Sequence, residues 1–190
     1  MFSVALIILA AGNSSRLGRP KQHLPYLDKT LLERVIDEGL KAGLSPVIVV
    51  EGGAKLAVPN GVTVVENHNW QLGMGTSIVE GITALLEIDK NIEKIIISVC
   101  DQPYVSSNLF LKLISEQCDT QTGIVASAYA DTLGTPVLFT LKYFAELLRL
   151  KGKEGAKKIL NQAGEDISSV YFPQGDIDID TESDYNNLIN

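Results

Sequence analysis

The chain has 190 residues, 45% of them hydrophobic and 21% charged, and carries a formal net charge of -7 at pH 7. The length suits one domain with a substantial core, and the acidic balance argues against a general nucleic-acid- or membrane-surface-binding protein. The two cysteines, Cys100 and Cys118, exclude a disulfide framework, and no apolar run approaches the ~20 residues that span a bilayer. Because no signal peptide is recognisable, we expect one cytoplasmic domain over residues 1–190 that binds neither membranes nor nucleic acid.

Apolar, β-branched runs alternate with helical patterns, which predicts an α/β protein with a parallel or mostly parallel sheet. The first run is apolar at every position, as in a strand buried on both faces. The strands are expected at Val4–Leu9, Pro46–Val50, Val62–Val65, Ile95–Val99, Ile124–Ala128, Pro136–Phe139 and Ser169–Phe172, with a turn containing Asp131 and Gly134 between the fifth and the sixth. The helices are expected from Thr30, where Glu33 completes a capping box, to near Gly43, from Thr76 to about Glu87, from Ser106 onward, at Lys142–Leu148, at Glu154–Gln162, and from near Thr181 to the C-terminus.

The segment that follows the first strand, from Leu9 to Lys21, combines small residues, two glycines, two serines and three cations. Backbone N–H groups and serine hydroxyls can cradle phosphate oxygens, while Arg16, Arg19 and Lys21 supply positive charge. Open α/β sheets bind ligands beyond the carboxyl ends of their strands, where this loop is expected. The spacing fits neither the Walker loop nor the dinucleotide fingerprint. We interpret the segment as a polyphosphate-binding loop; a glycine-rich turn with solvated basic side chains is the alternative.

Asp101 follows the strand expected at Ile95–Val99 and should reach the same crevice as the first loop. Mg²⁺ prefers one or two carboxylates together with phosphate oxygens, so Asp101 is a candidate metal ligand. The alternative is that Asp101 caps the helix expected after Pro103. We expect Cys100 to be a small buried residue and not a nucleophile, since no adjacent His or basic side chain would lower its pKa.

A second acidic segment lies near the C-terminus, where Asp176, Asp178 and Asp180 alternate along the chain. In an extended conformation these three side chains share one face and repel one another, so a metal or a basic partner is expected. Asp180 or Thr181 could also cap the last helix, with Asp184 in its first turn, and the two interpretations are compatible.

Glycines and hydroxyl side chains also gather between Asn67 and Ile78, immediately before a predicted helix. Gly73 and Ser77 could form part of an anion or ligand cradle at the N-terminus of this helix. A helix-capping loop without ligand contact is the alternative. Trp70 could stack on a ring or serve as a core or hinge residue.

The first loop resembles the signature L-A-A-G-x-S-x-R-x-G-x-P-K of the molybdenum-cofactor nucleotidyltransferases, with Leu17 where methionine is usual. Its Ala10-Ala11-Gly12 form is similar to the cytidylyltransferase branch, whereas guanylyltransferases more often carry a second glycine there. Further segments that resemble the family are D-Q-P from Asp101, N-x-x-W-x-x-G-M-x-x-S from Asn67, G-x-P-x-x-F from Gly134, and D-I-D-T-x-x-D-Y from Asp178. The resemblance runs from Leu6 to Tyr185.

The resemblance implies a three-layer, Rossmann-like nucleotidyltransferase fold with a mostly parallel, mixed sheet. It also implies a Mg²⁺-dependent enzyme that transfers CMP from CTP to molybdopterin and releases pyrophosphate, with a molybdoenzyme as a possible recipient of the product. The nucleotide contacts that it implies are Leu9, Ala10, Ala11, Gly12, Ser14, Ser15, Arg16, Lys21, Gly73 and Ser77. The catalytic groups are Arg16, Lys21 and Asp101, and the metal ligands are Asp101, Asp180 and Asp178. The acceptor contacts are Gly134, Pro136, Gly155 and Lys157.

One segment departs from the family pattern. Gly152 to Lys157 stands where the family usually reads G-D-x-G-A-R, with Lys153 in place of the acid and Lys157 in place of the arginine. Lysine cannot reproduce a bidentate guanidinium contact, so the acceptor is less determined than the reaction type. GTP or another nucleotide, another phosphorylated acceptor, and a non-catalytic protein that delivers a pterin dinucleotide are the alternatives.

Overall fold

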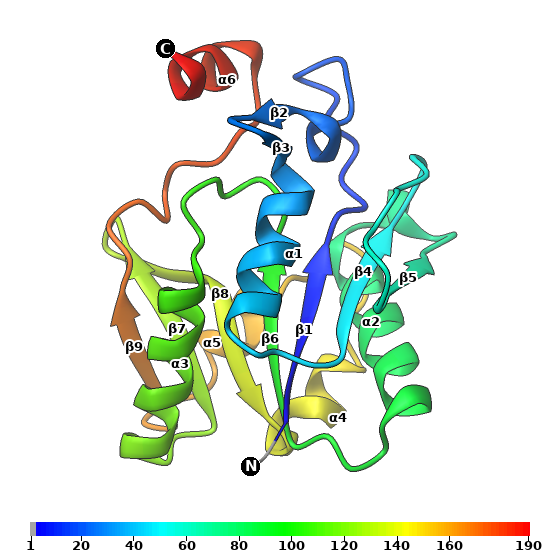
Figure 1. Ribbon diagram of the computed structural model, residues 1–190. Coiled ribbons are helices and arrows are strands. Elements are labelled where there is room, and N and C mark those ends of the chain that lie inside the picture. The colour runs from blue at the N-terminus through cyan, green and yellow to red at the C-terminus, as the bar shows by residue number, and fades with distance from the viewer. Residues whose placement is uncertain (1–2) are drawn as a thin grey trace.

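The computed structural model describes residues 3–190, which form one seven-stranded sheet in the order β5-β4-β1-β6-β8-β7-β9 (Figure 1). The strands are β1 (Val4–Leu9), β4 (Val47–Glu51), β5 (Val62–Glu66), β6 (Lys94–Val99), β7 (Ile124–Tyr129), β8 (Thr132–Thr140) and β9 (Ile167–Tyr171). Strand β8 pairs antiparallel with both β6 and β7, and the other neighbouring pairs are parallel. The mostly parallel, mixed sheet predicted from the sequence is confirmed.

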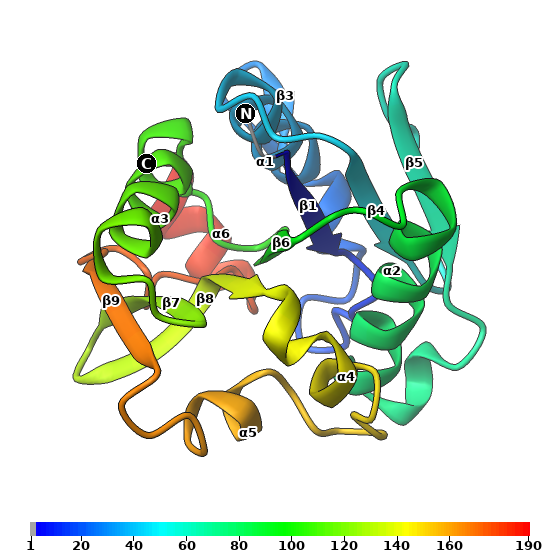
Figure 2. The ribbon, with the colours of Figure 1, turned by 90° about the horizontal axis from the view of Figure 1, so that it is seen from below.

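Helices cover both faces of this sheet. Seen from below (Figure 2), α1 (Leu31–Lys41) and α3 (Ser107–Thr120) lie on one side, and α2 (Met74–Ile88), α4 (Phe144–Leu147) and α5 (Lys157–Leu160) on the other. The last helix, α6 (Glu182–Ile189), and the small hairpin of β2 (Pro25–Tyr26) and β3 (Lys29–Thr30) lie beyond the carboxyl end of β1 (Figure 1). The predicted three-layer arrangement is therefore confirmed. Within residues 3–190 no helix is both long and apolar enough to cross a membrane.

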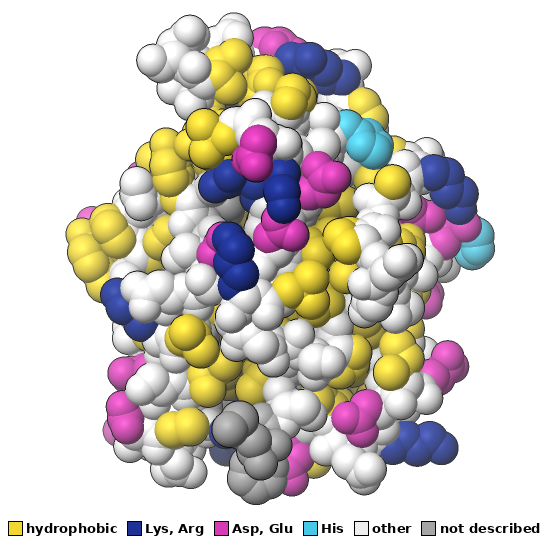
Figure 3. Space-filling model, viewed as in Figure 1, with side chains coloured by type: hydrophobic (Ala, Val, Ile, Leu, Met, Phe, Trp, Pro, Cys, Tyr) yellow, Lys and Arg dark blue, Asp and Glu magenta, His cyan; other side chains and the backbone are white. Residues whose placement is uncertain are grey.

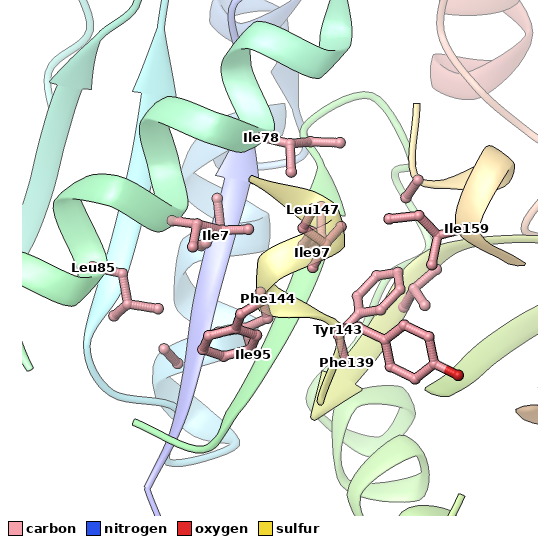
Figure 4. Close-up of a cluster of buried hydrophobic side chains, with 14 of the residues drawn as sticks. Ile7, Ile78, Leu85, Ile95, Ile97, Phe139, Tyr143, Phe144, Leu147 and Ile159 are labelled. Atoms are coloured by element: carbon pink, nitrogen blue, oxygen red, sulfur yellow. The ribbon is translucent and has the colours of Figure 1, made fainter. Parts of the chain in front are cut away.

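The continuous apolar run of β1 is explained by the two layers that it separates. Its alternate residues Ala5, Ile7 and Leu9 belong to the core beneath α2, while Val4, Leu6 and Ile8 belong to the core beneath α1 and α3. Figure 4 shows Ile7 near α2, within the cluster to which β6, β8 and α4 also contribute side chains. Each fully buried Val, Leu or Ile side chain contributes about 1.5–3 kcal/mol of transfer free energy. The sheet is therefore stable enough to hold the loops at its carboxyl end in position.

The first helix begins as predicted, because Thr30 and Glu33 form the expected capping box. Two later helices are much shorter than predicted. Lys142–Leu148 divides into a 3₁₀ turn at Leu141–Tyr143 and the four-residue α4, and Glu154–Gln162 reduces to Lys157–Leu160. Helix α5 does not start at Glu154 because this residue closes a turn. Its backbone N–H donates to the Lys151 carbonyl, and its carboxylate accepts from the Lys151 N–H.

The hairpin between β7 and β8 also differs from the prediction. Its tight turn consists of Ala130 and Asp131, both with positive φ (44° and 56°), as a two-residue hairpin with the favoured twist requires. Gly134 lies outside the turn, within β8, and pairs with Ser127. A glycine is needed there because a Cβ atom would come within 2.0 Å of the Tyr129 hydroxyl.

Asp166, just before β9, provides a test of how this edge of the sheet is held. Its carboxylate accepts hydrogen bonds from Lys142 (2.7 Å), the Tyr143 hydroxyl (2.7 Å) and the Gly123 N–H (2.8 Å), and these lower the pKa of Asp166 to about 2. A carboxyl with a lowered pKa stabilises the fold above its ordinary pKa and loses this contribution as the pH falls toward the folded value.

We therefore expect Asp166→Asn to lower the free energy of unfolding at pH 7 by about 1 kcal/mol, a figure reduced for solvent screening because the side chain is 28% exposed. Urea unfolding of wild type and variant at pH 7, 4 and 3 measures the difference, which should shrink below pH 4. A difference that is constant over this range would contradict the assignment of the effect to the charged carboxylate.

Candidate active site

A cavity of about 590 Å³ opens beyond the carboxyl ends of β1 and β6, between the first loop and the start of α2. Several residues predicted to contact the nucleotide or the metal line it, namely Leu9, Ala11, Gly12, Lys21, Gly73, Ser77 and Asp101. They meet here because β1 and β6 are parallel neighbours, with Leu9 beside Val99, so their following loops emerge at the same edge. Ala10 lies just outside the lining, buried beneath the loop.

The shape of the first loop is set largely by hydrogen bonds within it. The Ser14 carbonyl accepts from the N–H groups of Leu17 (3.1 Å) and Gly18 (3.0 Å), and its hydroxyl accepts from the N–H of Lys21 (3.1 Å). Gln22, only 2% exposed, donates from Nε2 to the Ala10 carbonyl (3.0 Å). Ser14 thus shapes the loop in addition to any ligand contact.

Lys21 connects the two acidic segments. Its ammonium group donates to one carboxylate oxygen of Asp101 and to Oδ1 of Asp180 at 2.8 Å, and Arg16 donates to the other oxygen of Asp180. Burial of Lys21, whose side chain is 12% exposed, opposes its charge, but the two carboxylates outweigh burial and raise its pKa. The hydrogen bond from Lys21 in turn lowers the pKa of Asp180. Lys21 and Asp180 are therefore both charged at neutral pH.

Asp178 has no cationic partner among residues 3–190. Burial, followed by the negative charges of Asp180 and Asp101, raises the pKa of Asp178. Within residues 3–190 no three acidic, His or Cys side chains are already arranged as a metal site, and Lys21 lies between two of the carboxylates. Mg²⁺ needs only one or two carboxylates when phosphate oxygens supply further ligands, and hard carboxylate oxygens are the donors that it prefers. The donor set therefore fits Mg²⁺ together with a bound polyphosphate.

The local structure decides between the alternatives for the acidic residues. Ser106, and not Asp101, caps α3, since its hydroxyl accepts from the Leu109 N–H. Thr181 caps α6 and forms a capping box with Asp184, which leaves the carboxylate of Asp180 free to face Lys21. The two interpretations of this segment thus hold together.

Two expectations about reactive and charged side chains have different outcomes. Cys100 is buried, as predicted, and burial raises its pKa to about 12, so its thiol is protonated at neutral pH. Arg19, by contrast, faces α6: it donates to both carboxylate oxygens of Glu182 (2.8 and 3.0 Å) and lies over the Tyr185 ring. Of the three cations of the first loop, Arg16 and Lys21 thus meet the acidic residues at the cavity, and Arg19 meets α6. Figure 3 shows basic side chains lying beside acidic ones on the upper part of the molecule.

The start of α2 is held in place by buried polar contacts. Asn67 is fully buried and donates from Nδ2 to the hydroxyls of Thr76 (2.8 Å) and Ser77 (2.9 Å). The N–H of Gly75 donates to the Gly152 carbonyl (3.0 Å), so this donor is unavailable to an anion. Trp70, Gly73 and Ser77 of this segment line the cavity.

The predicted acceptor residues are divided between two places. Beside the main cavity lies a smaller one of about 340 Å³, lined in part by Met74, Asp101, Thr135 and Asp178. Thr135 joins Gly134 to Pro136 in β8, and a Cβ atom on Gly155 would lie 3.5 Å from the Met74 sulfur, so these three predicted residues are close to it. Lys157 is elsewhere: it donates to the Thr132 hydroxyl (3.1 Å) and lines a separate hollow.

A family model described as the MobA-like NTP transferase domain matches residues 6–167. The chain belongs to this family. It is accordingly an enzyme of the nucleotidyltransferase class, and the resemblance of its motifs to molybdenum-cofactor nucleotidyltransferases is confirmed.

Among curated proteins, this MobA-like transferase is 34% identical over 136 residues to a nicotine blue oxidoreductase of Paenarthrobacter nicotinovorans, covering 68% of this chain and 63%, less than two thirds, of that relative. It is 26% identical over 193 residues to the molybdenum cofactor cytidylyltransferase of Escherichia coli K12, covering 97% of this chain and 95% of that one.

Among solved structures, it is similar to the protein Rv0371c of Mycobacterium tuberculosis H37Rv, with 31% identity, a TM-score of 0.81, and coverage of 99% of this chain and 97% of that one. A complex of Rv0371c with manganese matches at 30% identity and a TM-score of 0.77, covering 98% of each chain.

Three buried amides of this transferase were missed in the sequence, although each lies within or beside a quoted motif. Besides Gln22 and Asn67, Gln102 donates from Nε2 to the Gly175 carbonyl (2.7 Å) and accepts from the Thr135 hydroxyl (3.1 Å). The Gln102 contacts join loops that are distant in sequence, whereas Gln22 and Asn67 each bond within their own segment. The only sign of these residues in the sequence was their position within or beside the motifs. Their hydrogen-bond partners could be known only from the fold.

Gly73 gives a test of how closely the loops pack. Its φ is +129°, and a Cβ atom would lie 2.5 Å from the Gly152 carbonyl oxygen. Gly61 has a similarly positive φ of +90° but no atom within 4 Å of the added Cβ. We expect Gly61→Ala to lower the free energy of unfolding by about 1 kcal/mol through backbone strain alone, and Gly73→Ala by at least about 2 kcal/mol more through the clash. Urea unfolding measures both, and equal losses would contradict the close packing.

Proposed function

We propose that the protein transfers CMP from CTP to molybdopterin, with release of pyrophosphate, in a Mg²⁺-dependent reaction. We further propose that residues 1–190 act as one nucleotidyltransferase domain in the cytoplasm, and that a molybdoenzyme receives the product. The observation that carries the proposal is the meeting of Lys21 with Asp101 and Asp180 at the mouth of a cavity lined by the first loop. A bound triphosphate needs cationic side chains and a metal ion close together. Here the chain brings together a cationic side chain and the carboxylates that could bind the metal.

Each part of the site has a role in this reaction. Arg16, Lys21 and the backbone N–H groups of the first loop hold the triphosphate and stabilise the charge that develops at the pentacoordinate phosphorus. Asp101 and Asp180, with Asp178 beside them, are the residues that would hold Mg²⁺, which neutralises phosphate charge when bound. The site positions the attacking phosphate of the acceptor, so alignment and charge stabilisation suffice and no protein nucleophile is required.

The choice of CTP is supported by Ala11, whose side chain lies at the cavity and beside Gly52. A methyl group at this position narrows the space for a purine, and one group of this size discriminates by about 1–3 kcal/mol. Similarity to a cytidylyltransferase along nearly the whole chain gives further support. GTP remains the alternative nucleotide. The paired carboxylates favour an enzyme over a carrier of a finished dinucleotide, which has no need of them.

The proposal is tested by pyrophosphate release in the presence of Mg²⁺ with each of the four nucleoside triphosphates, with and without molybdopterin. We expect release to require molybdopterin and to be fastest with CTP, with kcat/KM for CTP at least about tenfold above that for GTP, which corresponds to ~1.4 kcal/mol. A preference for GTP would contradict the choice of nucleotide, and turnover that ignores molybdopterin would contradict the acceptor. No turnover under any condition would favour the carrier.

The same assay tests the metal ligands with a matched control. Asp101→Asn and Asp180→Asn should each lose nearly all turnover while retaining the fold, as judged by circular dichroism. Asp119→Asn removes an exposed carboxylate at the end of α3 and should match wild type. Turnover within about threefold of wild type, a change of less than ~1 kcal/mol, would exclude the altered residue as an essential ligand.

A further inference from the structure

A second hollow, of about 600 Å³, lies between the β7–β8 turn, α5 and the end of β9. It is about as large as the main cavity, yet of its residues the sequence analysis assigns only Lys157 to the acceptor. Its lining is Ala128, Tyr129, Ala130, Asp131, Thr132, Leu133, Lys157, Asn161 and Tyr171. The lining therefore combines a carboxylate, an amide, a hydroxyl, an ammonium group and two tyrosines around a space large enough for a small molecule.

The polar groups of this hollow are mostly free to bind a ligand. Lys157 donates to the Thr132 hydroxyl, and within residues 3–190 neither Lys157 nor Asp131 has an ion-pair partner. Tyr171, at the end of β9, is 76% exposed, which is unusual for a large aromatic side chain. The hollow thus offers a carboxylate, an amide, a cation and an exposed ring that are largely free of contacts within the fold.

The hollow adjoins the acceptor side of the active site at Tyr129, a residue that lines both this hollow and the smaller cavity containing Asp101. The Tyr129 ring meets Phe172 edge-on, with centroids 6.2 Å apart. Cβ atoms on Gly134 and Gly175 would lie 2.0 and 2.2 Å from atoms of Tyr129, so two glycines make room for this ring. The Tyr129 ring is therefore held in one position by the residues around it.

The turn that carries Asp131 has a defined backbone. Ala130 and Asp131 both adopt the left-handed conformations that this two-residue hairpin requires. The turn therefore fixes the position of Asp131 in the lining of the hollow, to which Asn161 of the segment that follows α5 also contributes.

We propose that this hollow binds the part of the acceptor that is remote from the reacting phosphate, and that this part is a planar heteroaromatic ring. The ring offers adjacent N–H donors to the Asp131 carboxylate and a carbonyl oxygen to Asn161 or Lys157, and Tyr171 covers one face. A pterin has this pattern of donors and acceptors. The inference rests on the proposed function, in which the acceptor carries a pterin, and adds the residues that recognise it.

The test is equilibrium binding of free pterin, with adenine as a ring of different edge chemistry, to the full-length protein without nucleotide. Asp131→Asn is the key variant, because asparagine tolerates the left-handed conformation while losing the charge and one acceptor oxygen. We expect wild type to bind pterin more tightly than adenine, and Asp131→Asn to bind pterin at least about tenfold more weakly. Tyr171→Leu, at an exposed position that does not endanger folding, should also weaken binding severalfold.

Asp119→Asn is the matched control for loss of a carboxylate and should bind pterin as wild type does. Equal affinity for pterin and adenine, or an Asp131→Asn affinity within twofold of wild type, would overturn the subsite. In turnover, Asp131→Asn should raise the KM for molybdopterin and leave kcat and the KM for CTP unchanged. Turnover with an unchanged KM for molybdopterin would reject the subsite and spare the proposed function. Pterin binding that depends on Asp131, without turnover on molybdopterin, would reject the proposed function and spare the subsite.

Discussion

The position of the Lys21 ammonium between Asp101 and Asp180 is the interaction on which the rest of the site depends. It links the loop after β1, the end of β6 and the segment before α6, which are up to 159 positions apart in the sequence. Burial alone would lower the pKa of this lysine, but two carboxylates within hydrogen-bond reach outweigh burial and raise it. The same cation lowers the pKa of Asp180, so the groups that a phosphate and a metal need are kept charged together.

The sheet makes this arrangement possible, and buried amides complete it. Because β1 and β6 are adjacent and parallel, their following loops reach one edge, where the cavity opens. Gln22 and Asn67 then fix the shapes of their own loops, and Gln102 binds the loop after β6 to the distant Gly175 carbonyl. Each hydrogen bond from a buried side-chain amide stabilises the fold by about 1 kcal/mol, and leaving a buried partner without a hydrogen bond costs more. The loops are therefore held in a defined shape before any ligand binds. This order suits a reaction that depends on alignment.

The sequence predicted the strands well because those at the centre of the sheet are buried on both faces and read as continuous apolar runs. It predicted Asp101 and Asp180 as neighbours because both stand in motifs beyond strand ends. It could not predict that Arg19 faces Glu182, since a cation in a loop gives no sign of which acid it will meet. The overlong helix expected at Glu154–Gln162 has a local cause, since Glu154 instead closes a turn with Lys151. A tertiary contact decided the first difference and a local turn the second.

The most direct test of the role of Lys21 is the pKa of Asp180, measured by carbon-13 NMR of the side-chain carboxyl in wild type and in Lys21→Met. Methionine keeps most of the volume of lysine and removes its charge and its hydrogen bonds. We predict a pKa below the ordinary range for aspartate in wild type, because Lys21 stabilises the charged form. In the variant it should rise, because burial and the nearby carboxylates then act with only Arg16 to oppose them. An Asp180 pKa that is the same in both proteins would contradict the account.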